Sequence, residues 1–285
     1  MQKQTSFGKD EGRLYLVPTP IGNLEDITLR AKRILQEADY IAAEDTRTSG
    51  IMLKKIGISN KMLSFHKFNS KQKAPEMIEL LKKGATIAEI SDAGMPVISD
   101  PGYILVQECI KNDIPVVALP GPSAFATALI ASGFNQPFTY YGFLPKKKKD
   151  QRAVFETMKK TPTTAIFYEA PHRLVKTVAS MAAVFEPDRK IVLARELTKV
   201  HEEYLRGTIA EVNAYLQDHA PRGEYVVLVE PAKADEEDEV DLDDLVAQVQ
   251  DLVASGAFAK DAIKQVAKAS GVAKNQLYDY YQRKK

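Results

Sequence analysis

The chain has 285 residues, of which 45% are hydrophobic and 27% charged, and its formal net charge at pH 7 is +1. This is the composition of an ordinary globular protein with room for two modest domains and a small third, and its net charge indicates no particular partner. The single cysteine, Cys109, excludes a disulfide framework and a thiolate zinc cluster. No apolar run is long enough to span a membrane and the N-terminus has no signal-peptide core, so we expect a cytoplasmic protein.

The first half of the chain alternates short β-rich runs with helical patterns. The predicted strands are Arg13–Pro18, Asp39–Glu44, Met62–His66, Ala85–Ile90 and Pro115–Pro120. The predicted helices are Ile27–Ala38, Ile51–Ile56, Pro75–Lys83, Tyr103–Lys111 and Ser123–Ala131. This alternation indicates right-handed βαβ units around a parallel sheet.

Beyond Gly133 the order of elements changes. The predicted strands are Thr139–Phe143, Thr163–Glu169, Lys190–Glu196, Glu202–Ile209 and Glu224–Glu230, with helices at Asp150–Lys159 and Arg173–Phe185. The last three strands are separated by only a short helix, which favours antiparallel pairing within a mixed sheet.

These patterns predict an α/β protein with four segments. Residues 1–134 form an N-terminal parallel α/β domain, and residues 135–231 form a second, mixed α/β domain. An acidic linker covers residues 232–240, and residues 241–285 form a helical module that resembles a helix-turn-helix. Strand-end loops of the two α/β domains are expected to face one cleft.

Three loops rich in glycine and proline follow strands of the first sheet: residues 17–23, 91–102 and 120–124. Glycine exposes backbone groups to a ligand, and proline fixes a loop before binding. Each loop alone could be a structural turn, but in an open parallel sheet all three meet at the edge where ligands bind. A GxGxxG fingerprint and a P-loop are both missing, so the crevice is not built for a dinucleotide or a nucleoside triphosphate.

Six ordered motifs carry a resemblance that covers nearly the whole chain from Leu14: VPTPIGN, AAEDTRTS, SDAGMPVISDPG, PGPSA, FYEAPHR and LARELTK. Together they resemble the methyltransferase I family of small-subunit ribosomal RNA methyltransferases, in the tetrapyrrole methylase superfamily. The resemblance implies a homodimer that holds S-adenosylmethionine between its two domains. It also implies methyl transfer to the ribose 2′-oxygen of a cytidine in the decoding region of small-subunit (16S) ribosomal RNA. Met95 departs from the pattern, because threonine is the more usual residue there; a backbone role survives this change and a hydroxyl role does not.

S-adenosylmethionine has no pyrophosphate, which agrees with the missing phosphate fingerprint. We expect cofactor contacts from Pro20, Asp92, Gly94, Met95, Ile98, Ser123 and Ala124 of the first domain, and from Tyr168 and Leu197 of the second. Asp92 could instead only cap its turn. His66 and His201 have no partners at ligand spacing, so no metal site is predicted.

A ribose hydroxyl needs a general base, or desolvation with strict alignment, before it attacks a methyl group. The candidates are Glu44, Asp45, Glu169 beside His172, and Glu196 beside Lys199. Each could equally form a surface salt bridge or cap a helix, and Asp45 before Thr46 is itself an N-cap signal. The sequence does not single out one base.

Charge is distributed unevenly along the chain. Eight acidic residues and one lysine lie between residues 233 and 244, and residues 260–285 hold seven basic and two acidic residues, a local balance of +5. Expected RNA contacts are Arg47, Lys146, Lys147, Lys148, Lys149 and Lys274. In the tail, the packing face and turn of a helix-turn-helix are expected from Val266, Ala267, Gly271, Val272, Leu277 and Tyr280. A small structural cap or a dimer accessory is the alternative for this module.

The expected partners are therefore small-subunit ribosomal RNA within the particle and a second copy of the chain, with no membrane. Two other functions stay open. One is a superfamily methyltransferase that acts on a small molecule or a protein, and the other is a non-catalytic RNA-binding module.

Overall fold

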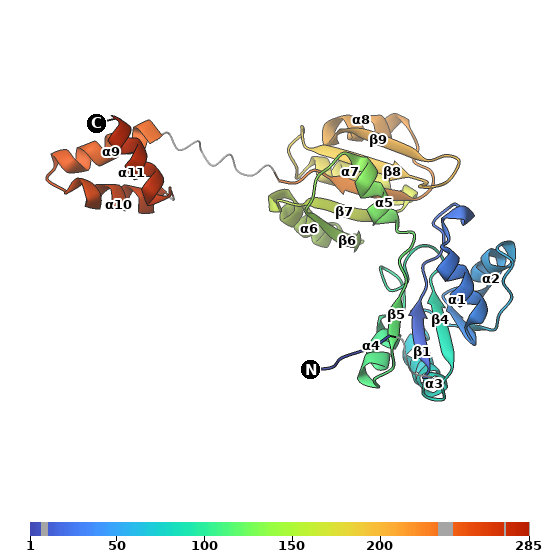
Figure 1. Ribbon diagram of the computed structural model, residues 1–285. Coiled ribbons are helices and arrows are strands. Elements are labelled where there is room, and N and C mark those ends of the chain that lie inside the picture. The colour runs from blue at the N-terminus through green and yellow to red at the C-terminus, as the bar shows by residue number, and fades with distance from the viewer. Residues whose placement is uncertain (7–10, 233–241, 271, 285) are drawn as a thin grey trace. The chain divides into compact units, whose positions relative to one another are not determined.

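The structure is a computed structural model that describes residues 1–6, 11–232, 242–270 and 272–284 (Figure 1). The chain divides into two compact units, Met1–Pro231 and Ala232–Lys285, which are described separately. Apart from Ala232, the predicted acidic linker lies outside the described residues. Within the described ranges, no helix has the length and apolar character needed to cross a membrane.

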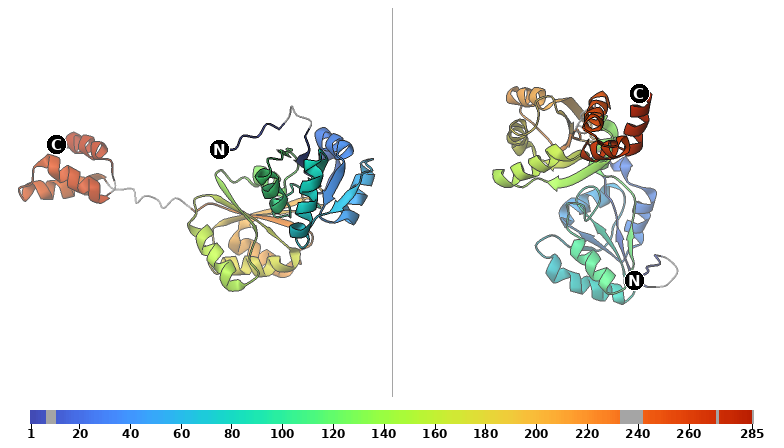
Figure 2. Two further views of the ribbon diagram at one scale, coloured as in Figure 1. Left: turned by 90° about the horizontal axis from the view of Figure 1, so that it is seen from below. Right: turned by 90° about the vertical axis from the view of Figure 1, so that its left-hand side faces the viewer.

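The first unit begins with a five-stranded sheet of order β3-β2-β4-β1-β5, in which every pair of neighbours is parallel. Its strands are β1 Arg13–Leu16, β2 Tyr40–Ala43, β3 Met62–Ser64, β4 Thr86–Ile90 and β5 Val116–Ala118. The intervening helices are η1 Leu24–Asp26, α1 Leu29–Glu37, α2 Thr46–Lys55, α3 Ser70–Lys82 and α4 Tyr103–Lys111. They cover both faces of the sheet (Figure 2) and give it two separate apolar cores. The predicted parallel sheet is confirmed.

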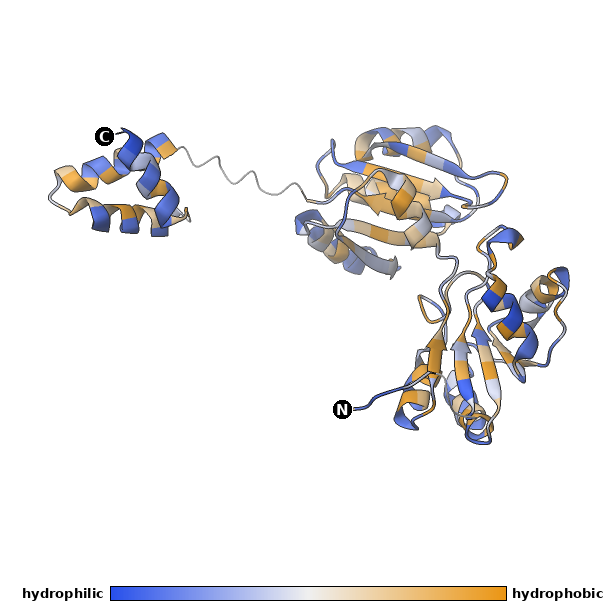
Figure 3. Cartoon of the chain, viewed as in Figure 1, coloured by the Kyte–Doolittle hydropathy of each residue, from blue (hydrophilic) through white to orange (hydrophobic). Residues whose placement is uncertain are grey.

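The second sheet has the order β6-β7-β10-β8-β9 and is antiparallel except between β6 and β7. Its strands are β6 Phe138–Phe143, β7 Thr164–Glu169, β8 Lys190–Arg195, β9 Glu203–Thr208 and β10 Tyr225–Val229. Helices α6 Lys148–Lys160, α7 Pro171–Ala182 and α8 Ile209–Asp218 accompany it. Strands β7, β8 and β10 lie in the centre of this sheet and are apolar along most of their length (Figure 3). This composition allows them to be buried on both faces. The predicted mixed sheet is confirmed.

Helix α5, Ala124–Ser132, joins the two sheets. Its buried residues Ala128 and Leu129 pack against Ile166, Val192 and the neighbouring side chains of the second sheet. The helix therefore starts in a loop of the first sheet and contributes its apolar side to the core of the second. The predicted domain boundary between residues 134 and 135 falls just after it, and that division stays a prediction.

Helices α2 and α3 each begin five residues before the start that their apolar patterns indicate. Helix α2 starts at Thr46, because the Asp45 side chain accepts a hydrogen bond from the Arg47 backbone N–H at 2.9 Å and caps the first turn. Helix α3 starts at Ser70 and contains Pro75, which was expected at its beginning. Proline favours the first turn of a helix, but here the turn at His66–Asn69 sets the start instead.

The second unit contains α9 Leu242–Ala254, α10 Ala259–Ser270 and α11 Lys274–Lys284. A small apolar core joins them, and it includes Val266, Ala267 and Leu277, with Val272 and Tyr280 packed against it. Asp243 on α9 accepts a hydrogen bond from the Tyr280 hydroxyl at 3.0 Å and pairs with Lys284 at 2.8 Å. The predicted packing residues thus share one core, whereas the predicted turn residue Gly271 lies outside the described residues.

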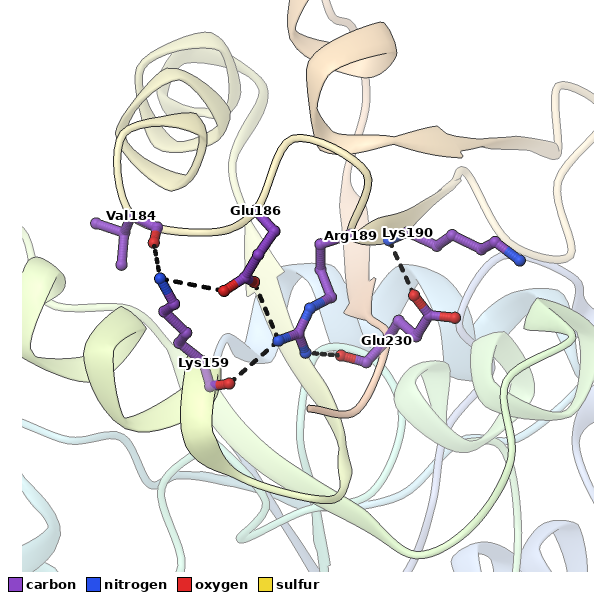
Figure 4. Close-up of polar contacts among 6 residues, drawn as sticks. All are labelled: Lys159, Val184, Glu186, Arg189, Lys190 and Glu230. Atoms are coloured by element: carbon purple, nitrogen blue, oxygen red, sulfur yellow. Dashed lines mark hydrogen bonds and ion pairs between the residues drawn. The ribbon is translucent and has the colours of Figure 1, made fainter. Parts of the chain in front are cut away.

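Arg189 links three segments of the first unit near the end of β10 (Figure 4). Its guanidinium donates to the carbonyl oxygens of Glu230 at 3.0 Å and Lys159 at 3.1 Å, and it pairs with Glu186 at 3.2 Å. Lys159 completes the network with a bond to the Val184 carbonyl oxygen at 3.1 Å. Because the Arg189 side chain is only 6% exposed, its guanidinium depends on these protein acceptors rather than on water.

We expect Arg189→Met to lower the free energy of unfolding by about 1 kcal/mol, because it removes a buried donor that binds three part-buried acceptors. Urea denaturation of the two proteins measures the difference. Arg33→Met is the control, because Arg33 pairs with Glu37 in the open, at 56% side-chain exposure, and should change the midpoint little. Equal midpoints for both variants would show that the network does not stabilise this end.

Candidate functional site

The first unit contains a cavity of about 510 Å³ between the loops of its two sheets. The first sheet contributes residues of the loops that follow β1, β2, β4 and β5, and the second contributes residues at the ends of β7, β8 and β10. Lining residues from the first side are Ile21, Glu44, Asp92, Ala93, Gly94, Met95, Ile98, Ser99, Asp100, Ser123 and Ala124. Lining residues from the second side include Phe143, Tyr168, Glu169, Ala194, Glu196, Leu197, Lys199 and Glu224.

The three glycine- and proline-rich loops lie against one another, as the sequence predicted for one sheet edge. Thr19 and Gly94 exchange two backbone hydrogen bonds, of 2.9 and 3.0 Å, which join the loops after β1 and β4. A side chain at Gly121 would meet the Pro18 ring at 2.6 Å, so the loop after β5 also packs closely on the loop after β1. The loops therefore form one preorganised wall of the cavity.

Several residues at this cavity have backbone conformations that L-amino acids seldom adopt. Val97 and Ser99 have φ values of 73° and 68° in the loop after β4, and Glu196 and Thr198 have φ values of 49° and 66° in the loop after β8. Such conformations cost free energy and persist where the surrounding structure enforces them, which is common at binding sites. The positive φ values in these two loops therefore indicate that the surrounding structure fixes the backbone on both sides of the cavity.

Three carboxyl groups of the first sheet face the cavity: Glu44, Asp92 and Asp100. Burial raises the pKa of Asp100 to about 6, and the charge of Asp92 adds to this rise while a hydrogen bond from Ser91 opposes it. Burial also raises the pKa of Glu44, with further rises from the charges of Asp100 and Asp92. Asp100 therefore changes its charge near pH 6, closer to neutral pH than an ordinary aspartate.

Two of the three glutamates that line the second side, Glu169 and Glu196, already have partners within the protein. Glu169 accepts hydrogen bonds from the Ala170 N–H at 3.0 Å and the Thr177 hydroxyl at 2.6 Å, and it pairs with Arg173 at 3.2 Å. Glu196 pairs with Lys199 at 3.0 Å, which lowers the pKa of Glu196, and it accepts from the Glu224 N–H at 3.1 Å. Both are bound in ways that hold the wall of the cavity in place.

The aromatic residues Phe143 and Tyr168 line the cavity, and Tyr140 and Phe125 lie next to them outside the lining. The Tyr140 ring lies 4.7 Å from Phe125 and 5.3 Å from Tyr168, and Phe143 lies 5.5 Å from Tyr168. The Tyr140 hydroxyl and the Ser99 hydroxyl are 2.8 Å apart, which links β6 to the loop after β4. Burial raises the pKa of both tyrosines, so they stay neutral near pH 7.

The loop after β4 packs at Gly102 against the buried carboxyl group of Glu89. Glu89 on β4 is 2% exposed, its Oε2 atom has no hydrogen-bond partner within the described chain, and burial raises its pKa to about 8. Gly102 lies directly against this carboxyl with φ +133°, and any side chain there would collide with it. The loop therefore needs glycine at 102 because of both its conformation and its contact.

Glu89 predicts a pH dependence of stability. The folded state keeps its proton up to a pH of about 8, whereas the unfolded carboxyl ionises near its ordinary value of 4.5. Unfolding therefore releases a proton over this range, and stability falls as the pH rises. We expect Glu89→Gln to remove much of this loss of stability, because glutamine does not ionise. The urea midpoint of the variant minus that of the wild type should therefore increase between about pH 5 and about pH 8. A constant difference would contradict a neutral Glu89.

The structure places the predicted site residues in three groups. Of the predicted cofactor residues, all but Pro20 line the cavity; Pro20 is buried next to the lining residue Ile21. Of the candidate bases, Glu44, Glu169, Glu196 and Lys199 line it, whereas Asp45 is outside the lining and pairs with Arg47 at 3.1 Å. The predicted RNA contacts lie outside the cavity, at Arg47, Lys146, Lys147, Lys148, Lys149 and Lys274.

Sequence reasoning did not name Asp100 or Ser99 as site residues, although both lie in the loop that it singled out. Both residues could have been predicted, because a loop that turns back on itself brings its second half, with Ser99 and Asp100, to the same cavity as Asp92. No group of three histidine, cysteine, aspartate or glutamate residues in the described ranges could hold a metal ion.

Comparison with known proteins agrees with this architecture. The sequence profile of the tetrapyrrole (corrin/porphyrin) methylases matches residues 13–213. Uroporphyrin-III C-methyltransferase from Thermus thermophilus, solved with S-adenosyl homocysteine, superposes with a TM-score of 0.56 at 16% identity, covering 76% of this chain and 97% of that one. The methyltransferase CobJ gives a TM-score of 0.59 at 17% identity, with 78% and 95% covered. The chain therefore belongs to the tetrapyrrole methylase family, and the predicted fold class is confirmed.

More similar sequences narrow this class. The chain is 50% identical over 285 residues to a protein of Streptococcus pyogenes serotype M1, which covers 99% of both chains. It is 46% identical to a protein of Bacillus subtilis (strain 168) and 44% identical to one of Escherichia coli O157:H7, each over at least 98% of both chains. All three relatives are named ribosomal RNA small subunit methyltransferase I, so the resemblance seen in the six motifs is confirmed.

Proposed function

We propose that the chain transfers a methyl group from S-adenosylmethionine to small-subunit ribosomal RNA, at the ribose 2′-oxygen of a cytidine in the decoding region. The observation that carries the proposal is the identity of 44–50% to proteins named for this RNA, along the full chain. The cavity supports it with a wall of preformed loops and a set of carboxyl groups.

The cavity suits S-adenosylmethionine in size and charge. Its volume of about 510 Å³ is in the range of small-molecule sites. The carboxyl groups of Glu44, Asp92 and Asp100 would attract the sulfonium, and Gly94 lines the cavity with no side chain to keep a ligand from its backbone. The residues that would hold the cofactor are Asp92, Gly94, Met95, Ile98, Ser123, Ala124, Tyr168 and Leu197, with Pro20 supporting the loop. When bound, the cofactor supplies an electrophilic methyl group.

The protein's own part in the reaction is to position the ribose and to remove its proton. We assign proton removal to Asp100, because it lines the cavity and its pKa of about 6 leaves it mostly ionised at neutral pH while still able to accept a proton. Glu169 and Glu196 act as positioning residues, since their oxygens already bind other groups of the protein. The rings of Phe143 and Tyr168, which line the cavity, limit the access of water.

RNA contacts outside the cavity are proposed for Arg47, for the lysines at 146–149 and for Lys274 at the start of α11. Lys264, Lys268 and Lys274 are exposed on the second unit, where cationic side chains would meet the phosphate backbone. We also propose a homodimer, a substrate within the small-subunit particle, and action in the cytoplasm, where such particles are found.

Removal of residues 241–285 should weaken RNA binding and leave S-adenosylmethionine affinity unchanged, because the cavity belongs wholly to the first unit. The salt dependence of RNA binding should become shallower, by about 0.7 in log–log slope for each phosphate that the shortened protein no longer binds. Fluorescence titration with RNA at several salt concentrations measures the RNA affinity and its salt slope, and a titration with S-adenosylmethionine measures the cofactor affinity. An unchanged slope would make the second unit a structural cap.

The proposed reaction is tested with S-adenosylmethionine that carries a labelled methyl group. Small-subunit ribosomal RNA transcribed in vitro is offered both naked and assembled into particles, and the labelled RNA is then digested to nucleosides. Mass spectrometry of the sugar and base fragments should find the label on the ribose of one cytidine. Label on a base would overturn the 2′-oxygen assignment, and no label on either RNA would overturn the proposed substrate.

A further inference from the structure

Residues 66–71, which run from the loop after β3 into the first turn of α3, present an aromatic side chain to solvent and are called the Phe68 loop below. Phe68 is 94% exposed, whereas Phe65, three residues before it, is 2% exposed and anchors the loop in the core. The Asn69 side chain accepts from the His66 N–H at 2.8 Å and donates to the Ser64 carbonyl oxygen at 3.1 Å. The backbone that carries Phe68 is therefore fixed, so exposure of the ring does not come from a loose segment.

The same loop is basic. Lysines occupy positions 67, 71 and 73, and no acidic residue occurs from His66 to Pro75. Lys73 pairs with Glu76 at 2.7 Å, but Lys67 and Lys71 are exposed and form no ion pair with any residue that the structure describes. An exposed ring between two such lysines is the combination that single-stranded nucleic acids bind, through base stacking and phosphate attraction.

The position of the loop relates it to the cavity. The Phe65 N–H donates to the Ala43 carbonyl oxygen at 2.8 Å, and Ala43 is followed by Glu44, which lines the cavity. Neighbouring strands are about 4.8 Å apart, so the Phe68 loop begins one strand away from the cavity wall. The carboxyl groups in the cavity repel phosphates, so an RNA that reaches the cavity needs cationic groups beside it.

We propose that the Phe68 loop is a stacking platform for the RNA substrate. Phe68 stacks on a base next to the nucleotide whose ribose enters the cavity, and Lys67 and Lys71 bind the flanking phosphates. A nucleotide that enters an enclosed site must leave its stack, and the ring replaces part of the stacking that its neighbours lose. This inference rests on the proposed function, because it assigns the RNA contact of that same site.

The test compares the wild type with Phe68→Leu, Phe68→Trp, and two double variants that each remove two positive charges. Lys67→Gln with Lys71→Gln changes the loop. Lys54→Gln with Lys55→Gln is the matched control, because these exposed lysines end helix α2, about 15 Å along the helix from its start at the cavity edge. Each protein is titrated with in vitro transcribed small-subunit RNA, and methyl transfer to the same RNA, naked or assembled, is measured.

We expect Phe68→Leu to weaken RNA binding at least about fivefold, and Phe68→Trp to keep wild-type affinity because it keeps a stacking surface. The loop double variant should reduce the log–log salt slope by about 1.4, and the control should leave it unchanged. S-adenosylmethionine affinity should be the same in all of these proteins.

Equal RNA affinity of Phe68→Leu and the wild type would overturn the platform. So would a change of mass in light scattering from dimer to monomer in Phe68→Leu, since the ring would then contact a second copy of the chain. A wild type that methylates neither naked nor assembled RNA would instead reject the proposed function, and the platform with it.

Discussion

Gly94→Val should weaken S-adenosylmethionine binding at least tenfold, which corresponds to about 1.4 kcal/mol. Gly94 has φ +80°, a conformation that a branched residue adopts only under strain, and its Cβ would lie 3.3 Å from the Ile21 side chain. The same backbone exchanges two hydrogen bonds with Thr19, so a shift at Gly94 also moves the loop after β1. Titration calorimetry measures the affinity directly.

Gly84→Val is the control for this experiment. Gly84 also has a positive φ, of 93°, but an added side chain would meet nothing within 4 Å, and the residue lies outside the cavity lining. Its variant should lose folding stability through backbone strain and keep its cofactor affinity. If Gly94→Val stayed folded and bound the cofactor as the wild type does, Gly94 would not belong to the binding site.

Asp100→Asn should lower the rate of methyl transfer by about 100-fold or more, the usual effect of removing a general base. In the wild type the ionised carboxylate is the active form, and the pKa of Asp100 is about 6. The rate should therefore rise with pH and reach half of its maximum near pH 6, if chemistry limits the rate. Asparagine cannot accept the proton, so the variant should lack this rise. Rates measured across the pH range under single-turnover conditions test both statements.

Two further carboxyl variants identify the group responsible. Asp45→Asn removes a carboxylate that lies outside the cavity lining and pairs with Arg47, so its rate and pH profile should match the wild type. Glu44→Gln removes the other carboxyl group whose pKa burial raises. If Glu44→Gln abolished the rise near pH 6 and Asp100→Asn retained it, the base would be Glu44.

The sequence by itself determined the order of the elements and the edge of the sheet at which the site lies. The alternation of strands and helices up to Gly133 allows only a parallel sheet, because parallel neighbours require a crossover connection. The glycine and proline positions in the loops at 17–23, 91–102 and 120–124 are local properties of the chain, and local properties can be recognised without the fold. For the same reason Asp92, Gly94 and Ser123, which the structure places at the cavity, could be predicted as cofactor contacts in advance.

Only the tertiary structure decided which partners each carboxyl group has and how burial shifts its pKa. Glu169 and Glu196 have the same chemistry as Asp100, but the partners that occupy them, Thr177 and Lys199, can be identified only once the chain has folded. The pKa of Asp100 likewise depends on burial and on the distance to Asp92, which no residue spacing specifies. The packing of α5 on the second sheet and the exposure of the Phe68 ring are also products of the fold. Burial and partner choice are collective properties, because they arise from side chains that are far apart in the sequence and meet only in the folded chain.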